Sequence, residues 1–189
     1  PFHDVGIDTL PCDGRPLIES ASVEIAPALW ILNQKHEPWP GPVNALLVGD
    51  AQQVTPEFPA LPGADAELRS IASFINTGKA NIVRGAAANP SAIRSMPLSG
   101  YGMIHFAAHA AANRLNPLES AIVLSKSGEG DYQLFTRQIL EMKLGHPLVT
   151  LSACRSAGAR SFSGEGFVGL TWAFLQSGAQ GVVAGLWTV

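Results

Sequence analysis

Cys154 is the residue of this sequence whose chemistry is most informative. It follows a short apolar run, residues 148–151, and begins a loop of small and polar residues. A thiol acts as a nucleophile only as the thiolate, which a neighbouring base or positive charge stabilises. Arg155 and Arg160 flank the loop that follows the thiol and could supply such a charge, although solvated surface charges are an equally plausible explanation. Most free cysteines are small buried side chains, but the position at a strand end favours a nucleophile.

His109 is the candidate base for that thiol. It ends the run of residues 101–109, which contains an apolar, strand-like segment, residues 103–108. In open α/β sheets, ligands bind outside the carboxyl ends of the strands. Because Cys154 and His109 both follow apolar strands, we expect them to meet at that edge as a nucleophile and its base.

Other residues that could do chemistry have simpler explanations. His105 precedes His109 by four residues, as in half of a metalloprotease motif, but no Glu lies between them and the segment predicts a strand. We therefore predict that His105 is a hydrogen-bonded core histidine and that Cys12 is an incidental turn residue. Residues 164–169 resemble part of a dinucleotide fingerprint but follow a polar loop rather than a strand. The sequence predicts neither a metal site nor a cofactor site.

The elements that must position these residues alternate between strands and helices. Strands are predicted over residues 43–49, 80–83, 103–108, 148–151 and 182–186, and helices over 65–75, 90–96, 136–143 and 166–176. An antiparallel excursion is predicted at 121–124 and 132–135, an irregular active-site loop at 110–119, and a peripheral strand and helix at 22–26 and 27–34. The pattern predicts an α/β fold with a mostly parallel sheet covered on both faces.

Several residues mark the predicted helix ends. Asn89 before Pro90 fits an N-cap followed by proline at the first helical position. Thr136 is predicted to cap the next helix, and Asp65 either caps an earlier helix or complements its dipole. Gly178 is predicted to stop the last helix.

Composition limits the classes of function. The 189 residues are 47% hydrophobic and fit one domain with a sizeable core. The net charge of -3 and the scattered basic residues argue against direct nucleic-acid binding. Two cysteines make no disulfide framework, so we expect a reducing, cytoplasmic setting, and no apolar run reaches the length of a membrane span. The sequence begins at Pro1 without Met and ends abruptly at Val189, so we expect a domain cut from a longer protein.

Five motifs in order resemble CHAT domains, caspase-fold relatives of separases that are often attached to TPR repeats. The resemblance extends from residues 11–18 to Trp187, nearly the whole chain. Its motifs are residues 104–109, 118–124, 151–157, 164–166 and 178–187. It implies a caspase-like, three-layer α/β/α sandwich over residues 1–189. It also implies a cysteine endopeptidase acting on protein or peptide substrates, with Cys154 as nucleophile, His109 as general base and no metal or cofactor.

The resemblance implies further roles. The oxyanion hole would consist of the backbone N–H groups of Cys154 and of the residue after the histidine, here Ala110 where glycine is usual. Asp50 would line the pocket for the side chain before the cut and select Arg or Lys, although Asp50 could equally shape a turn after Gly49. Some relatives have a second acidic residue at the position of Ser152. A TPR or effector segment would gate activity, and the alternative is a catalytically silent CHAT-fold interaction module.

Overall fold

The chain forms two compact units, residues 1–36 and 37–189. The computed structural model describes residues 11–12, 14–21, 44–52, 55–75, 79–113, 115–153 and 165–184. In the first unit, β1 (Pro11–Cys12) pairs antiparallel with β2 (Arg15–Pro16), and β2 leads into the 3-10 helix η3 (Leu17–Glu19). The sequence did not predict this small hairpin. The strand and helix predicted at 22–26 and 27–34 lie outside the described residues.

The second unit contains a parallel five-stranded sheet with the strand order β10-β9-β5-β3-β4. The strands are β3 (Ala45–Gly49), β4 (Ala80–Arg84), β5 (Met103–Ala107), β9 (Leu148–Ser152) and β10 (Gly181–Ala184). The central strands β3 and β5 are apolar along most of their length and buried on both faces, whereas the edge strands β4 and β10 are largely exposed or half-buried. The predicted α/β class and mostly parallel sheet are confirmed.

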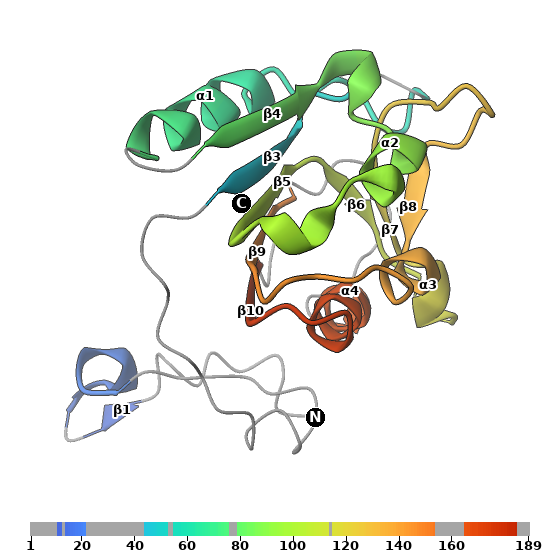
Figure 1. Cartoon of the computed structure of the whole chain (residues 1–189). Helices are drawn as coiled ribbons and strands as arrows, with labels where there is room; N and C mark the ends of the chain where they lie inside the picture. Colours follow the sequence, from blue (N-terminus) through green and yellow to red (C-terminus); the bar gives the residue numbers. More distant parts are fainter. Residues whose placement is uncertain are drawn as a thin grey trace. The chain divides into compact units, whose positions relative to one another are not determined.

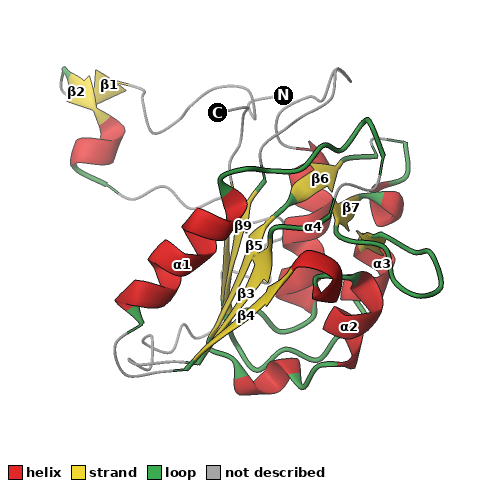
Figure 2. Cartoon of the chain, turned by 90° about the horizontal axis from the view of Figure 1, so that it is seen from above, coloured by secondary structure: helices red, strands yellow, loops and turns green. Residues whose placement is uncertain are grey.

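Helices cover both faces of this sheet, as Figures 1 and 2 show. On one face, α1 (Ala64–Phe74) packs Leu68 against Leu47 of β3. On the other, Leu46 and Val48 lie in a larger core. Three helices contribute buried residues to that core: α2 (Pro90–Ser95), α3 (Thr136–Ile139) and α4 (Glu165–Gln176). Alternate residues of one strand therefore serve two cores, which gives the caspase-like three-layer arrangement.

A second sheet is antiparallel and begins almost where β5 ends. It consists of β6 (His109–Ala111), β7 (Ala121–Val123) and β8 (Gln133–Phe135), in that order. The predicted antiparallel excursion is confirmed. The predicted irregular loop at 110–119 is wrong in part, because it begins within β6 and includes the 3-10 helix η7 (Pro117–Glu119). Two further 3-10 helices are η5 (Gly85–Ala87) and η6 (Leu98–Gly100).

The helix ends only partly follow the sequence signals. Asn89 caps α2 as predicted, accepting a hydrogen bond from the Ala92 N–H at 2.9 Å. Gly178 follows α4 with a φ of 101°, which glycine adopts without strain. Thr136 does not cap α3: it is the first helical residue, and its hydroxyl donates to the Ser120 carbonyl at 2.9 Å. That helix also ends at Ile139 rather than near residue 143.

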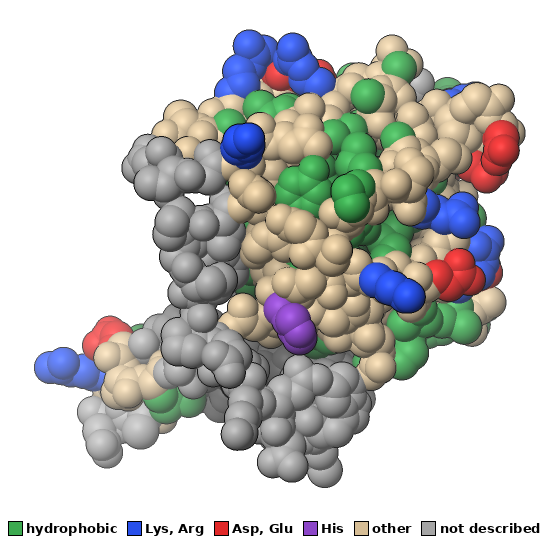
Figure 3. Space-filling view, viewed as in Figure 1, with side chains coloured by type: hydrophobic (Ala, Val, Ile, Leu, Met, Phe, Trp, Pro, Cys, Tyr) green, Lys and Arg blue, Asp and Glu red, His purple; other side chains and the backbone are tan. Residues whose placement is uncertain are grey.

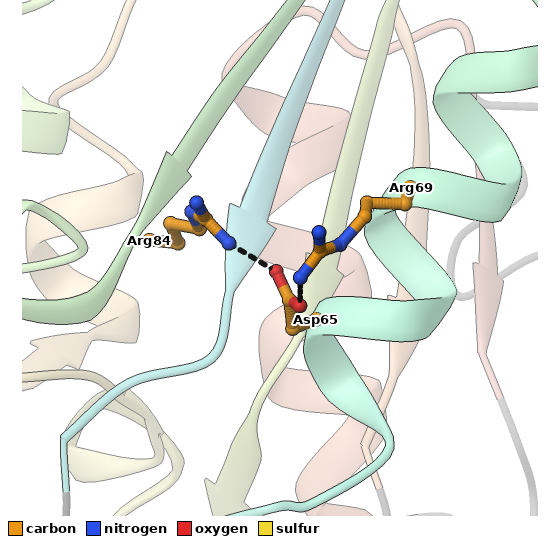
Figure 4. Close-up of polar contacts among 3 residues, drawn as sticks. All are labelled: Asp65, Arg69 and Arg84. Carbon is orange, nitrogen blue, oxygen red and sulfur yellow. Dashed lines mark hydrogen bonds and ion pairs between the residues drawn. The ribbon is translucent and has the colours of Figure 1, made fainter.

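Asp65 lies in the first turn of α1 and complements the helix dipole without capping it. Its carboxylate pairs with Arg69 of the same helix and with Arg84 at the end of β4, as Figure 4 shows. The pair with Arg84 joins α1 to the sheet at the surface. On the face shown in Figure 3, basic side chains lie apart or beside acidic ones rather than in one patch. Among the described residues, no helix has the length and apolarity that crossing a membrane requires.

Candidate functional site

The strand register aligns three neighbouring strand ends at one edge of the parallel sheet. Gly49 pairs with Ala107, and Ala107 pairs with Ser152. The chain therefore leaves β3, β5 and β9 at the same level, where an α/β fold places its ligands. Three of the residues singled out from the sequence follow these ends: Asp50 by one residue, and His109 and Cys154 by two.

His109 is the first residue of β6, and its side chain is only 5% exposed. Its Nε2 lies 2.7 Å from the backbone oxygen of Pro59, and its ring lies 5.8 Å from that of Phe58. A carbonyl oxygen can only accept a hydrogen bond, so Nε2 donates and must carry a proton. In the neutral imidazole, Nδ1 is then the nitrogen that accepts protons.

Neither Phe58 nor Pro59 was predicted as a site residue; both lie in a proline-rich segment between β3 and α1. An antiparallel bridge between Thr55 and Phe58 folds this segment back on itself. Pro59 acts through its main chain, and every residue has a carbonyl, so no side-chain pattern could have identified it. Fifty residues of sequence separate it from His109.

Two hollows lie beside His109. One, of about 260 Å³, is lined by residues that include Pro59, Leu61 and Ala108. The other, of about 180 Å³, is lined by residues that include Ala110, Leu151 and Ala153. Neither of these two hollows holds enough space for a peptide side chain and its backbone.

Cys154 itself lies outside the described residues, as does the loop of residues 155–164 with Arg155 and Arg160. Ala153, the residue before it, lines the same hollow as His109. Cys12, the other cysteine, lies in β1 of the first unit.

Ala110 lies within β6, where it pairs with Ile122. Its φ is not positive, so alanine carries no backbone strain at the position where the resemblance implies glycine. The substitution of alanine for glycine is thus compatible with the local fold.

Asp50 has a φ of 49°, in the left-handed region that Asp tolerates better than most residues. Its carbonyl accepts a hydrogen bond from the Gly85 N–H at 3.0 Å. The buried Ser125 hydroxyl fixes the same loop, donating to the Gly85 carbonyl and accepting from the Gln52 N–H. These hydrogen bonds hold the backbone at Asp50, while the predicted role of Asp50 in a substrate pocket stays a prediction. Ser152 accepts a hydrogen bond from the Ala108 N–H through its carbonyl, at 3.3 Å.

His105 is a buried, hydrogen-bonded core histidine, as predicted. Its Nδ1 lies 2.6 Å from the hydroxyl of Thr150 on β9, and its Nε2 lies 3.2 Å from Glu67 of α1. Burial lowers the pKa of His105, and the nearby Glu67 carboxylate partly offsets this by favouring the imidazolium. Among the described residues, no group of His, Cys, Asp and Glu could hold a metal ion.

The model of one protein family, described as the CHAT domain, matches residues 3–189 of the chain. No curated protein matches it.

Proposed function

Because the chain belongs to the CHAT domain family, which is related to caspase-like peptidases, we propose that it is a cysteine endopeptidase with a Cys154–His109 dyad. The observation that carries the proposal is the hydrogen bond between His109 Nε2 and the Pro59 carbonyl. It orients the imidazole at the carboxyl edge of the sheet and fixes the tautomer that has Nδ1 as the base. The neighbouring strand β9 leads in sequence to the thiol.

In the proposed reaction, Nδ1 of His109 takes the proton of the Cys154 thiol, and the thiolate attacks the scissile carbonyl carbon. The backbone N–H groups of Cys154 and Ala110 would stabilise the oxyanion of the tetrahedral intermediate. His109 then returns the proton to the leaving amine as the C–N bond breaks. Water, deprotonated by His109, hydrolyses the resulting thioester and regenerates the thiol. The Pro59 carbonyl stabilises the imidazolium that forms in each half of the reaction.

A thiol-directed peptide electrophile tests the dyad directly. We expect it to label Cys154, and we expect His109→Ala to slow labelling by roughly 100-fold or more, as loss of a general base does. Mass spectrometry of the digested protein identifies the labelled cysteine. Cys12→Ser and His146→Asn are matched controls that should label normally, and asparagine suits the positive φ of 59° at position 146. Equal labelling of Cys12 and Cys154, indifferent to His109, would exclude the dyad and favour a silent interaction module.

We also propose that Asp50 selects a basic side chain before the cut. Asp50 directly follows β3, whose last residue, Gly49, pairs with Ala107 of β5. Asp50 therefore lies at the edge of the sheet where His109 begins β6. A carboxylate that faces Arg in a partly dry pocket forms a charge-assisted and often bidentate pair. Ser152 contributes no second negative charge, so the preference would depend on Asp50 alone.

A further inference from the structure

His105 and Thr150 form an unusual pair within the parallel sheet. Among the described residues of its five strands, they are the only paired neighbours with two polar side chains. His105 is 4% exposed, and its Nδ1 lies 2.6 Å from the Thr150 hydroxyl oxygen. The pair connects β5, which leads to His109, with β9, which leads to Cys154.

His105 and Thr150 can form their hydrogen bond in only one register of β5 against β9. A slip of one residue would place His105 opposite Val149 or Leu151, and its ring nitrogen would lose the hydroxyl partner. Apolar pairs discriminate much less, because one aliphatic neighbour replaces another. A buried polar pair can therefore specify a register that the backbone ladder alone would not.

Register matters here because the two strand ends carry the two halves of the proposed dyad. One residue of slip moves a strand end by about 3.3 Å. A misplacement of about 1 Å in reacting groups can cost roughly 100-fold in rate. The level ends of β5 and β9, with Ala107 beside Ser152, are thus a condition for the dyad to assemble.

We propose that His105 is a positioning residue for the dyad: through Thr150 and Glu67 it holds β5, β9 and α1 in the arrangement that delivers His109. This inference rests on the proposed function. His105 touches no reacting group and acts through the register of β5. Among the described residues, Glu67 from α1 is the charged group that faces it, while the paired residues Leu47 of β3 and Thr150 of β9 carry no charge.

The charges favour one arrangement of protons in this cluster. A proton on Nε2 points toward the Glu67 carboxylate, whereas a lone pair there would be repelled by it. Nδ1 then accepts a hydrogen bond from the Thr150 hydroxyl. Nε2 has no well-aligned hydrogen-bond acceptor, although Glu67 lies within ion-pair distance. Glu67 thus contributes chiefly through its charge, and the directional bond is the one to Thr150.

The test separates positioning from mere stability. In the whole protein, Thr150→Val removes the hydroxyl without changing the shape of the side chain, and Thr150→Ser retains it. We expect Thr150→Val to slow labelling of Cys154 by roughly 10-fold or more and Thr150→Ser to label within about 2-fold of the unmodified protein. Thr150→Val alone leaves a ring nitrogen of the buried His105 without its partner and should lower the melting temperature. The double variant His105→Leu with Thr150→Val leaves no buried polar group unpaired, so its melting temperature should return toward that of the unmodified protein. Its labelling rate should stay low.

Several outcomes would overturn the proposal or the dyad on which it rests. Recovery of both melting temperature and labelling in the double variant would show that the pair only satisfies itself, and would overturn the proposal. Normal labelling of Thr150→Val, or a double variant that does not fold, would also overturn it, the latter by making the pair a requirement of folding. His109→Ala is measured beside them: if it labels normally, the proposed dyad fails, whatever the Thr150 variants do.

Discussion

Asp50 holds a backbone conformation that decides how its role can be tested. Its φ of 49° would strain an alanine, so loss of cleavage in Asp50→Ala would mix strain with the loss of charge. Asparagine also tolerates this region and has nearly the same shape. Asp50→Asn therefore removes the negative charge while preserving the backbone conformation at this position.

We predict that the protein cleaves after Arg or Lys and that Asp50→Asn loses this preference, because the neutral amide cannot pair with a buried guanidinium. The expected loss in kcat/KM for a basic side chain is roughly 100-fold. Fluorogenic peptides that differ only at the position before the cut measure it. Asp131→Asn, which removes a carboxylate from the exposed segment before β8, is the charge-matched control. Cleavage after apolar or acidic residues by the unmodified protein would contradict the prediction.

The buried His105 should make the stability of the protein depend on pH. Burial holds its folded-state pKa below the ordinary value of 6.5, so just below that pH the unfolded chain binds a proton that the folded chain does not. The free energy of unfolding should therefore fall as pH falls through this window and should be fully retained above it. Urea unfolding at a series of pH values measures the slope.

Two variants test the sign of this effect. His105→Leu should lack this part of the pH dependence. Glu67→Gln removes the charge that raises the pKa of His105, so the folded-state pKa should fall further and the loss of stability on acidification should grow. The same slope in the unmodified protein and in His105→Leu would assign the effect to other groups.

At the scale of elements, the cap of α2 offers a stability test distant from the site. Asn89→Ala should cost about 1 kcal/mol in free energy of unfolding, because the Ala92 N–H loses its acceptor. Asn89→Asp retains an acceptor and should cost less. Chemical denaturation measures both. An equal loss of stability in Asn89→Asp and in Asn89→Ala would contradict this and would show that the second bond, from the Asn89 side-chain amide to the Ala86 carbonyl, is the more important one.

Elements with strong local signals were predictable from the sequence. The apolar runs of β3, β5 and β9 lie between turn residues, and Asn89 with Pro90 marks a helix start by its own chemistry. Elements defined by distant partners were not. β6 is a strand because β7 pairs with it, and three residues including two alanines carry no pattern of their own.

The candidate site divides in the same way. His109 was found because a histidine after an apolar strand is conspicuous in the sequence. Pro59 was not, since its contribution is a carbonyl shared by every residue. Thr136 gave a misleading signal: its hydroxyl is used by a carbonyl from another segment, so the capping bond falls to Gln138, whose side chain accepts from the Phe135 N–H.

At the scale of the whole molecule, the two hollows beside His109 are small. We propose that a TPR or effector segment opens the proposed site. The 189-residue chain alone should then turn over peptides slowly, and the protein with its neighbouring segment and trigger should exceed it by roughly 10-fold or more. Turnover of a peptide panel by both forms measures the difference. Equal rates would refute the proposed gating.

The bond between His109 and Pro59 has a genetic consequence. Any residue substituted at position 59 still presents a backbone carbonyl, so a screen of point mutants for lost proteolysis would find positions 109 and 154 and pass over position 59. Proline's rigidity would be lost, at a modest cost in stability. Only a deletion or insertion between β3 and α1, which shifts the carbonyl away from the imidazole, would expose it. A catalogue of essential side chains would thus name the thiol and the imidazole and leave out the backbone carbonyl that the proposed chemistry also uses.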